Sequence, residues 1–271
     1  MTTHADRFVE IDDLAARIPD GCTLAVSKDE AGVAMAATRS LIRRGAKELD
    51  LLCVPVSGLQ ADLLIGAGCL ASIECSAVTL AEFGMAPRFR DAVQGGRLPI
   101  RDATCPAIYA ALQAAEKGNP FAPIRGLIGS DIFAHRDDWK VTPNPFADDD
   151  PIVVVPALRP DVALFHARLG DRAGNVWVAN RRELVIMAHA ARASLVTVEE
   201  IYDGNLIADE KLVAGTIPAL YVDAVAHAPN GAWPLALAGC YEEDAAHLRH
   251  YAEAARTDDG FASYLDRYVH R

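Results

Sequence analysis

The chain has 271 residues, of which 51% are hydrophobic and 23% charged, a balance that excludes a disordered protein and allows a large buried core. Its formal net charge of −11 argues against nucleic acid and anionic membranes as partners, because both require a basic surface. No apolar run approaches the roughly 20 residues of a membrane-spanning helix. The segment from Met1 to Arg7 lacks the charged and then apolar pattern of a signal peptide.

The apolar runs of the first half alternate with helical patterns. Strands are predicted at 23–26, 49–54 and 71–78, and helices at 33–43, 59–67 and 106–117. The region from 135 to 151 interrupts this rhythm with three prolines and three consecutive aspartates. It is predicted to be a surface excursion, with an edge hairpin, that precedes a second strand–helix series.

That second series is predicted to begin with a strand at 152–155. Further strands are expected at 162–165, 195–201 and 217–225, and helices at 183–192, 242–255 and 259–268. Strand–helix alternation favours an α/β fold with an open, mostly parallel sheet and helices on both faces. No internal repeat is visible, so we expect a single domain over residues 1–271.

The cysteines and histidines show no metal-binding pattern. Six cysteines are scattered without a Cys-x-x-Cys pair, and the histidines lack a clustered partner. We therefore predict reduced thiols, a cytoplasmic location and no metal. His166, His189 and His227 are interpreted as core or turn residues, whereas His247 and His250 are expected in solvent on a helix.

The loop after the first strand, residues 27–32 (Ser-Lys-Asp-Glu-Ala-Gly), is the first candidate site. A loop that leaves the carboxyl end of a strand and enters a helix is where α/β sheets bind ligands. Ser27 and Lys28 would supply side-chain donors there. The alternative is a simple helix cap, in which Ser27 or Asp29 satisfies free backbone N–H groups.

Two further candidates come from single residues. Cys105 directly precedes a predicted helix, where the helix dipole favours a reactive thiolate, although a cap or packing role for Thr104 and Cys105 is the alternative. Arg125 lies between Ile124 and Gly126 and is suited to hold a carboxylate or phosphate through two hydrogen bonds. A surface ion pair is the alternative for this arginine.

Several motifs, taken in order, resemble a known family. They are Pro-Ala-Leu-Arg-Pro-Asp at 156–161, His-Ala-Arg at 166–168, Gly-Asp-Arg-Ala-Gly-Asn at 170–175, Glu-Glu at 199–200 and Pro-Asn-Gly-Ala-Trp-Pro at 229–234. The chain is similar to the A-type subunits of the family I CoA-transferases, the glutaconate CoA-transferase-like group, over roughly residues 20–270. This resemblance implies a CoA-transferase type of fold.

The resemblance also implies a site. In the family, the loop at 27–32 is rich in glycine and forms an oxyanion hole, but here only Gly32 remains. The segment 119–130 matches a part of the family that skirts the active site, which adds Gly129 and Ser130 to the expected binding residues and implies that Arg125 holds an acyl carboxylate or CoA.

The nucleophile of the family is a glutamate, and in two-chain members it belongs to the B-type subunit. Glu74 and Glu82 are the local alternatives, but neither has a Glu-Asn-Gly-like setting. The resemblance thus implies a hetero-oligomer with a homologous B-type subunit, and CoA as a substrate with no permanently bound cofactor. An acyl-CoA (ring-opening) hydrolase of the same superfamily and a non-catalytic acyl-CoA-binding domain are the alternative functions.

Overall fold

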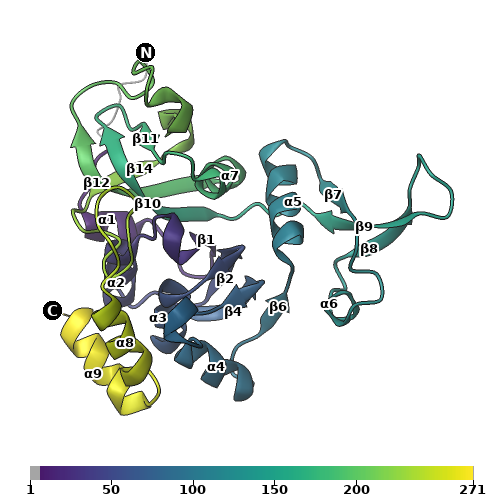
Figure 1. The fold of residues 1–271 in the computed structure, drawn as a ribbon, viewed down its shortest axis with the longest axis horizontal. Helices are drawn as coiled ribbons and strands as arrows, with labels where there is room; N and C mark the ends of the chain where they lie inside the picture. The colour runs from purple at the N-terminus through teal and green to yellow at the C-terminus, as the bar shows by residue number, and fades with distance from the viewer. Residues whose placement is uncertain (1–6, 271) are drawn as a thin grey trace.

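The computed structural model describes residues 7–270, which form a central sheet covered by helices and a smaller sheet that projects away from it (Figure 1). The strands are β1 (Thr23–Ser27), β2 (Leu49–Val54), β3 (Val56–Ser57), β4 (Leu70–Cys75), β5 (Ala77–Val78), β6 (Ile100–Asp102), β7 (Phe121–Ile124), β8 (Lys140–Pro143), β9 (Pro151–Pro156), β10 (Val162–Asp171), β11 (Val176–Trp177), β12 (Ala193–Tyr202), β13 (Thr216–Ile217) and β14 (Ala224–His227). The α-helices are α1 (Ile11–Ala16), α2 (Met35–Arg43), α3 (Leu59–Gly66), α4 (Pro87–Gln94), α5 (Cys105–Glu116), α6 (Asp131–Ala134), α7 (Arg182–Ala190), α8 (Ala245–Ala254) and α9 (Asp258–Tyr268).

The central sheet is mostly parallel. Strands β14, β12, β10, β1, β2, β4 and β6 lie side by side in this order, and all of their pairings are parallel. The short strands β11 and β13 add antiparallel pairs beside the far end of β10. The predicted open, mostly parallel α/β sheet is therefore confirmed.

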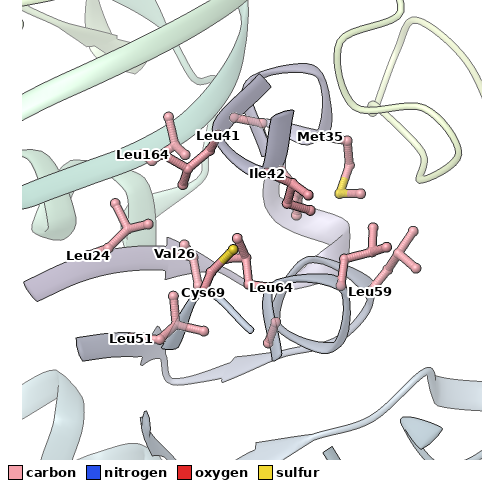
Figure 2. Close-up of a cluster of buried hydrophobic side chains, with 14 of the residues drawn as sticks. Leu24, Val26, Met35, Leu41, Ile42, Leu51, Leu59, Leu64, Cys69 and Leu164 are labelled. Carbon is pink, nitrogen blue, oxygen red and sulfur yellow. The ribbon is translucent and has the colours of Figure 1, made fainter. Parts of the chain in front are cut away.

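Both faces of the sheet are buried, which explains why its strands are continuously apolar. Leu24 and Val26 of β1 point to one face, where they pack with Met35 of α2 and Leu59 of α3 (Figure 2). Ala25 points to the other face and belongs to the core that α5 and α7 cover. Because alternate apolar residues of a strand face opposite sides of the sheet, helices must cover both faces to bury them.

A small antiparallel sheet interrupts the chain between α5 and β10. Its strand order is β7–β9–β8, and it projects away from the central sheet (Figure 1). The predicted strand at 152–155 exists as β9, but it pairs with β7 and β8 and does not start the second series of the main sheet. That interpretation was wrong, because an apolar run alone does not show which strands it will pair with.

Most of the other predicted elements are present, with boundary shifts of a few residues. The sequence missed α1, α4, α6, β3, β6, β7 and β11, all short, and it merged β4 with β5 and β13 with β14. The expectation that His247 is solvated was wrong, because its side chain is buried and its Nε2 lies 2.7 Å from the Tyr264 hydroxyl.

None of the helices between residues 7 and 270 is long and apolar enough to cross a membrane. The first six residues, for which the sequence predicts no signal peptide, lie outside the described part of the chain.

Candidate active site

The loop after β1 lies at the carboxyl edge of the sheet and closes against β10. The carbonyl oxygen of Gly32 accepts hydrogen bonds from the backbone N–H of His166 at 2.8 Å and from the Ser27 hydroxyl at 3.3 Å. Gly32 has φ +91°, and a Cβ at this position would collide with the carbonyl oxygen of His166. Only glycine allows this backbone conformation and this close approach, which accounts for the one glycine that the loop retains.

The three residues at the carboxyl end of β1 and just beyond it point their side chains in different directions. Ser27 is fully buried and is used within the loop. The Lys28 ammonium stays partly accessible and lies 3.7 Å from a carboxylate oxygen of Glu183 in α7. Asp29 instead reaches across to α3, where its Oδ2 accepts the Leu59 N–H at 3.1 Å. Lys28 is therefore the cation that the loop presents at the sheet edge.

Burial makes the Asp29 carboxyl an unusually weak acid. Desolvation, together with the neighbouring carboxylates of Glu30 and Glu243, raises the pKa of Asp29 to about 7, although the N–H groups at the start of α3 oppose the shift. One of its two oxygens, Oδ1, is buried without a hydrogen-bond partner among the described residues. The predicted capping role of Asp29 is therefore present, but toward a helix distant in sequence.

A polar cluster lies beneath this loop, with Glu199 at its centre. Glu199, near the end of β12, accepts hydrogen bonds from His166 Nε2 at 3.1 Å, from the Tyr241 hydroxyl at 3.1 Å and from the Asn230 N–H at 2.8 Å. On the other side of the ring, His166 Nδ1 lies 2.8 Å from the Thr197 hydroxyl. One carboxylate thus joins β10, the loop after β14 and the segment before α8.

The protonation states follow from burial and from these bonds. Burial lowers the pKa of His166 despite the nearby carboxylate, so the ring is neutral near pH 7. Partial burial opposes ionisation of Glu199, but the hydrogen bonds from its three partners outweigh it and lower the pKa of this carboxyl. Since an ionised carboxylate only accepts, His166 carries its proton on Nε2 and accepts at Nδ1.

The loop after β14 holds the start of α2 in place. The carbonyl oxygen of Gly231 accepts the Ala36 N–H at 2.9 Å, and that of Trp233 accepts from Arg39 at 3.0 Å. A Cβ at Gly231 would press on the His166 ring, so glycine is needed here as well. The first loop is therefore held by β10, and the helix into which it leads is held by the Pro-x-Gly-Ala-x-Pro segment.

Sequence reasoning identified both segments but missed their connection. It interpreted His166 as an isolated core or turn histidine, whereas the structure pairs it with Glu199. The paired glutamates near the end of β12 were the available signal. The parallel register places Thr197 beside His166, and Glu199, two residues further along the strand, points to the same side.

Cys105 is exposed at the first position of α5, after the capping residue Thr104. Its Sγ lies 3.2 Å from the hydroxyl of Ser76, which follows β4. Burial and the proximity of both Glu183 and Cys105 raise the pKa of Tyr109. Cys105 follows β6 and Ser76 follows β4, and both strands run parallel to β1, so the structure brings Cys105 to the same edge of the sheet as the loop at 27–32.

Arg125, Gly129 and Ser130 lie elsewhere, in the segment 117–161 between α5 and β10, which includes the predicted excursion at 135–151 and is called the excursion from here on. Arg125 is 70% exposed and forms a bidentate ion pair with Asp150, with a distance of 2.7 Å for its second hydrogen bond. Ser130 caps α6, and Gly129 adopts a left-handed turn before it. Within this chain, Arg125 thus forms the surface ion pair that the sequence left open, and a substrate-binding role for these three residues stays a prediction.

The local glutamate candidates have other surroundings. Glu74 accepts a hydrogen bond from Arg136 at 2.9 Å and lies 3.7 Å from Arg101, so its carboxylate belongs to an ion-pair network. Glu82 is exposed in a 3-10 helix, Ala81–Phe83. Among the residues described, no group of three or more His, Cys, Asp or Glu side chains is arranged to hold a metal ion.

The chain matches the family described as Coenzyme A transferase over residues 8–228. It is 32% identical over 259 residues to the A-type subunit of the 3-oxoadipate CoA-transferase of Pseudomonas knackmussii, covering 93% of this chain and 89% of that one. It is 30% identical over 281 residues to the cholesterol ring-cleaving hydrolase IpdA subunit of Mycobacterium tuberculosis, covering 97% and 93%.

Among solved structures, the glutaconate coenzyme A-transferase of Acidaminococcus fermentans matches with a TM-score of 0.91 and 26% identity, over 97% of this chain and 89% of that one. The family match covers most of the chain, and the similarity to named A-type subunits extends over nearly all of it. The chain therefore belongs to the coenzyme A transferase family, as an A-type subunit of a family I CoA-transferase.

Proposed function

We propose that this chain acts with a homologous B-type subunit to move CoA between acyl-CoA thioesters and carboxylic acids. The observation that carries the proposal is the loop at 27–32, which presents Lys28 at the carboxyl edge of the sheet while the chain's own candidate glutamate, Glu74, is held by Arg136. The site therefore offers electrostatic assistance, and the nucleophile is expected from the partner.

The chemistry needs one carboxylate nucleophile. A glutamate oxygen of the partner attacks the thioester carbonyl, the C–S bond breaks, and CoA leaves as the thiolate while a mixed anhydride forms. The thiolate then attacks the glutamyl carbonyl, which releases the first acid and leaves a glutamyl-CoA thioester. A second acid reverses both steps. Negative charge develops on the carbonyl oxygen in each attack, where a fixed cation or N–H group stabilises it.

In this scheme Lys28 supplies positive charge near that oxygen, and Gly32 lets the loop lie close to β10. Ser27 does not act as a free donor, because its hydroxyl is buried and bonded to Gly32. The roles of Arg125, Gly129 and Ser130 require a substrate or partner that reaches the excursion. We also propose a cytoplasmic setting, which suits the six free cysteines.

The test is reconstitution with a B-type chain encoded beside it, followed by a CoA-exchange assay. We expect CoA transfer that depends on both chains and on an added carboxylic acid, and loss of transfer when the partner's glutamate is replaced. A pair of chains that forms no complex and shows no thioester exchange would overturn the proposal.

The similarity to ring-cleaving hydrolase subunits favours a second candidate, an acyl-CoA (ring-opening) hydrolase. The same assay separates the two functions, because a hydrolase releases free CoA or opens a ring without any acceptor acid. Strict dependence on the acceptor would exclude the hydrolase.

A further inference from the structure

The side chain of Asp29 ties the loop after β1 to the loop after β2. The two strands are parallel neighbours, so their loops leave the same edge of the sheet. Asp29 lies in the first loop, and its Oδ2 accepts the Leu59 N–H, which follows the second loop, at 3.1 Å. The two residues are 30 positions apart in the chain. A side chain of the first loop therefore caps α3, the helix that follows the second.

Gly58 makes room for this carboxyl group. It directly precedes α3, at the position where a helix is usually capped by a side chain of its own, and glycine has none. A Cβ at Gly58 would collide with Oδ2 of Asp29 and would lie 2.5 Å from the carbonyl oxygen of Thr79. The place of the usual cap is thus taken by Asp29, and the N–H groups at the start of α3 hold its carboxyl.

The anchoring of Asp29 sets the direction of Lys28. Lys28 has an extended backbone, with φ −72° and ψ 157°, in which consecutive side chains point to opposite sides. The carboxyl group of Asp29 is accordingly buried, whereas 35% of the Lys28 side chain is exposed. The Lys28 carbonyl oxygen also accepts the Ala31 N–H at 2.9 Å, which closes a turn over Asp29–Ala31. A carboxyl held at α3 therefore keeps Lys28 directed toward the edge of the sheet.

We propose that Asp29 is a positioning residue, which holds Lys28 where negative charge develops during CoA transfer. The inference rests on the proposed function and adds a second residue of the loop to it. A cation that is already oriented stabilises developing charge better than a mobile one, because no reorganisation is needed during the reaction. Asp29 acts through Lys28 and through the backbone between them, and its own carboxyl group faces the interior.

A purely structural cap is the alternative, and the chain contains a matched example. Thr257 caps α9, and its Oγ1 accepts the Gly260 N–H at 3.1 Å, the same distance as in the Asp29 contact. Loss of either cap should destabilise the fold to a similar extent. Loss of the Asp29 cap should in addition release Lys28, and this second effect separates a positioning residue from a simple cap.

The first test is a double-mutant cycle on CoA transfer by the complex with the B-type partner. Lys28→Met should lower kcat by about 100-fold, as loss of one stabilising group at a reacting oxygen does. Asp29→Ala should lower kcat by roughly 10-fold with KM nearly unchanged, because a misplaced Lys28 weakens transition-state stabilisation alone. In the Lys28→Met background, Asp29→Ala should have little further effect.

Two further variants complete the kinetic test. Asp29→Asn keeps an oxygen that accepts the Leu59 N–H, so it should retain most of the wild-type kcat. Thr257→Ala removes the matched cap and should also keep the wild-type kcat. Asp29→Ser, whose hydroxyl is one bond shorter than the carboxyl, takes the place of Asp29→Ala if that variant does not fold.

Hydrogen–deuterium exchange tests the anchor without turnover, on the full chain and on its complex. Asp29→Ala should speed exchange in the peptides that cover 27–34 and 57–62, because the N–H groups of Ala31 and Leu59 lose their fixed partners. Asp29→Asn and Thr257→Ala should leave both peptides at the wild-type rate.

The proposal would be overturned by a fall in kcat on Asp29→Ala that is equally large with and without Lys28, or by unchanged exchange in both peptides. A kcat of Thr257→Ala as low as that of Asp29→Ala would likewise reduce Asp29 to a simple cap. Absence of CoA transfer by the wild-type complex would overturn the proposed function, whereas the exchange experiment would still decide whether Asp29 fixes the loop.

Discussion

The Nε2 atom of His166 lies 3.1 Å from Oε2 of Glu199, and this contact links the strand that holds the first loop to the segment that holds the start of α2. The backbone of His166 binds Gly32, while the other oxygen of Glu199 binds the N–H of Asn230. The loop at 27–32 therefore depends on a carboxylate that it does not touch. A buried network of this kind is rigid only when all its members are satisfied.

Glu199→Gln should weaken both the fold and the activity of the complex. In the variant, an NH2 group replaces one carboxylate oxygen and faces a hydrogen-bond donor that this oxygen binds in wild type. We therefore expect a loss of about 1–3 kcal/mol in the free energy of unfolding. Urea unfolding and kcat/KM of the reconstituted enzyme measure the two effects. Glu200→Gln, at the exposed neighbour on the same strand, is the control and should change neither. Equal behaviour of the two variants would contradict the network's role.

Gly32→Ala should be more harmful than an ordinary glycine replacement. Gly45 also has a positive φ, +75°, but a Cβ there would meet nothing within 4 Å, so Gly45→Ala measures the backbone strain alone, about 1–2 kcal/mol. At Gly32 the collision with the His166 carbonyl adds to this strain. We expect a larger fall in unfolding free energy for Gly32→Ala, together with loss of CoA transfer. Similar stabilities of the two variants would show that β10 yields to the methyl group.

His247 should make the protein less stable in acid. Burial lowers the pKa of His247 to about 4 from an ordinary 6.5, so the unfolded chain binds a proton that the folded chain refuses. This contribution is complete above pH 6.5 and is lost as the pH falls toward 4, by up to about 3 kcal/mol. Unfolding of wild type and His247→Gln between pH 4 and 8 measures it. The difference between the two should change only below pH 6.5, and a pH-independent difference would refute the assignment.

Asp29 should act in the opposite direction. Its raised pKa, about 7, means that the folded chain holds a proton that the unfolded chain releases above about pH 4. Relative to Asp29→Asn, which does not titrate, wild type should therefore lose stability as the pH rises from 4 to 7. Urea unfolding at pH 5 and pH 8 gives the comparison, with the exposed Asp13→Asn as control. The result would count against this reasoning if Asp29→Asn lost stability, relative to wild type, at the higher pH.

The sequence predicts those elements of the fold that depend on neighbouring residues, and it predicts poorly those that depend on residues far apart in the chain. Strands β1, β2 and β10 were evident in the sequence because each is a compact apolar run between turn residues. The motifs that resemble the family indicated the fold class. The separate pairing of β9 was not evident, because pairing depends on strands far away in the chain. Short helices such as α4 were missed for a related reason, since their stability comes mainly from packing.

The candidate site divides in the same way. The positions of Ser27, Lys28 and Gly32 follow from one local rule, that loops after parallel strands gather at one edge. The partners of His166 depend instead on which side chains of β10 and β12 meet, which local patterns do not determine. Arg125 illustrates the remaining difficulty, because a well-placed arginine and a surface ion pair look alike in sequence.

Cys105 provides the last prediction. Its Sγ lies beside Ser76 at the edge that also carries Lys28, so a reactive thiol there would be in place to form an acyl adduct. We nevertheless expect Cys105→Ser to leave turnover nearly unchanged, because the proposed nucleophile is a glutamate of the partner, and serine preserves a small polar group at the first turn of α5. Arg125→Ala, in contrast, should weaken substrate use if the excursion reaches the substrate in the complex. Kinetics of both variants in the reconstituted enzyme test this difference. Complete loss of activity in a folded Cys105→Ser enzyme, with an acyl-cysteine adduct of the wild type detected by mass spectrometry, would move the nucleophile to this chain.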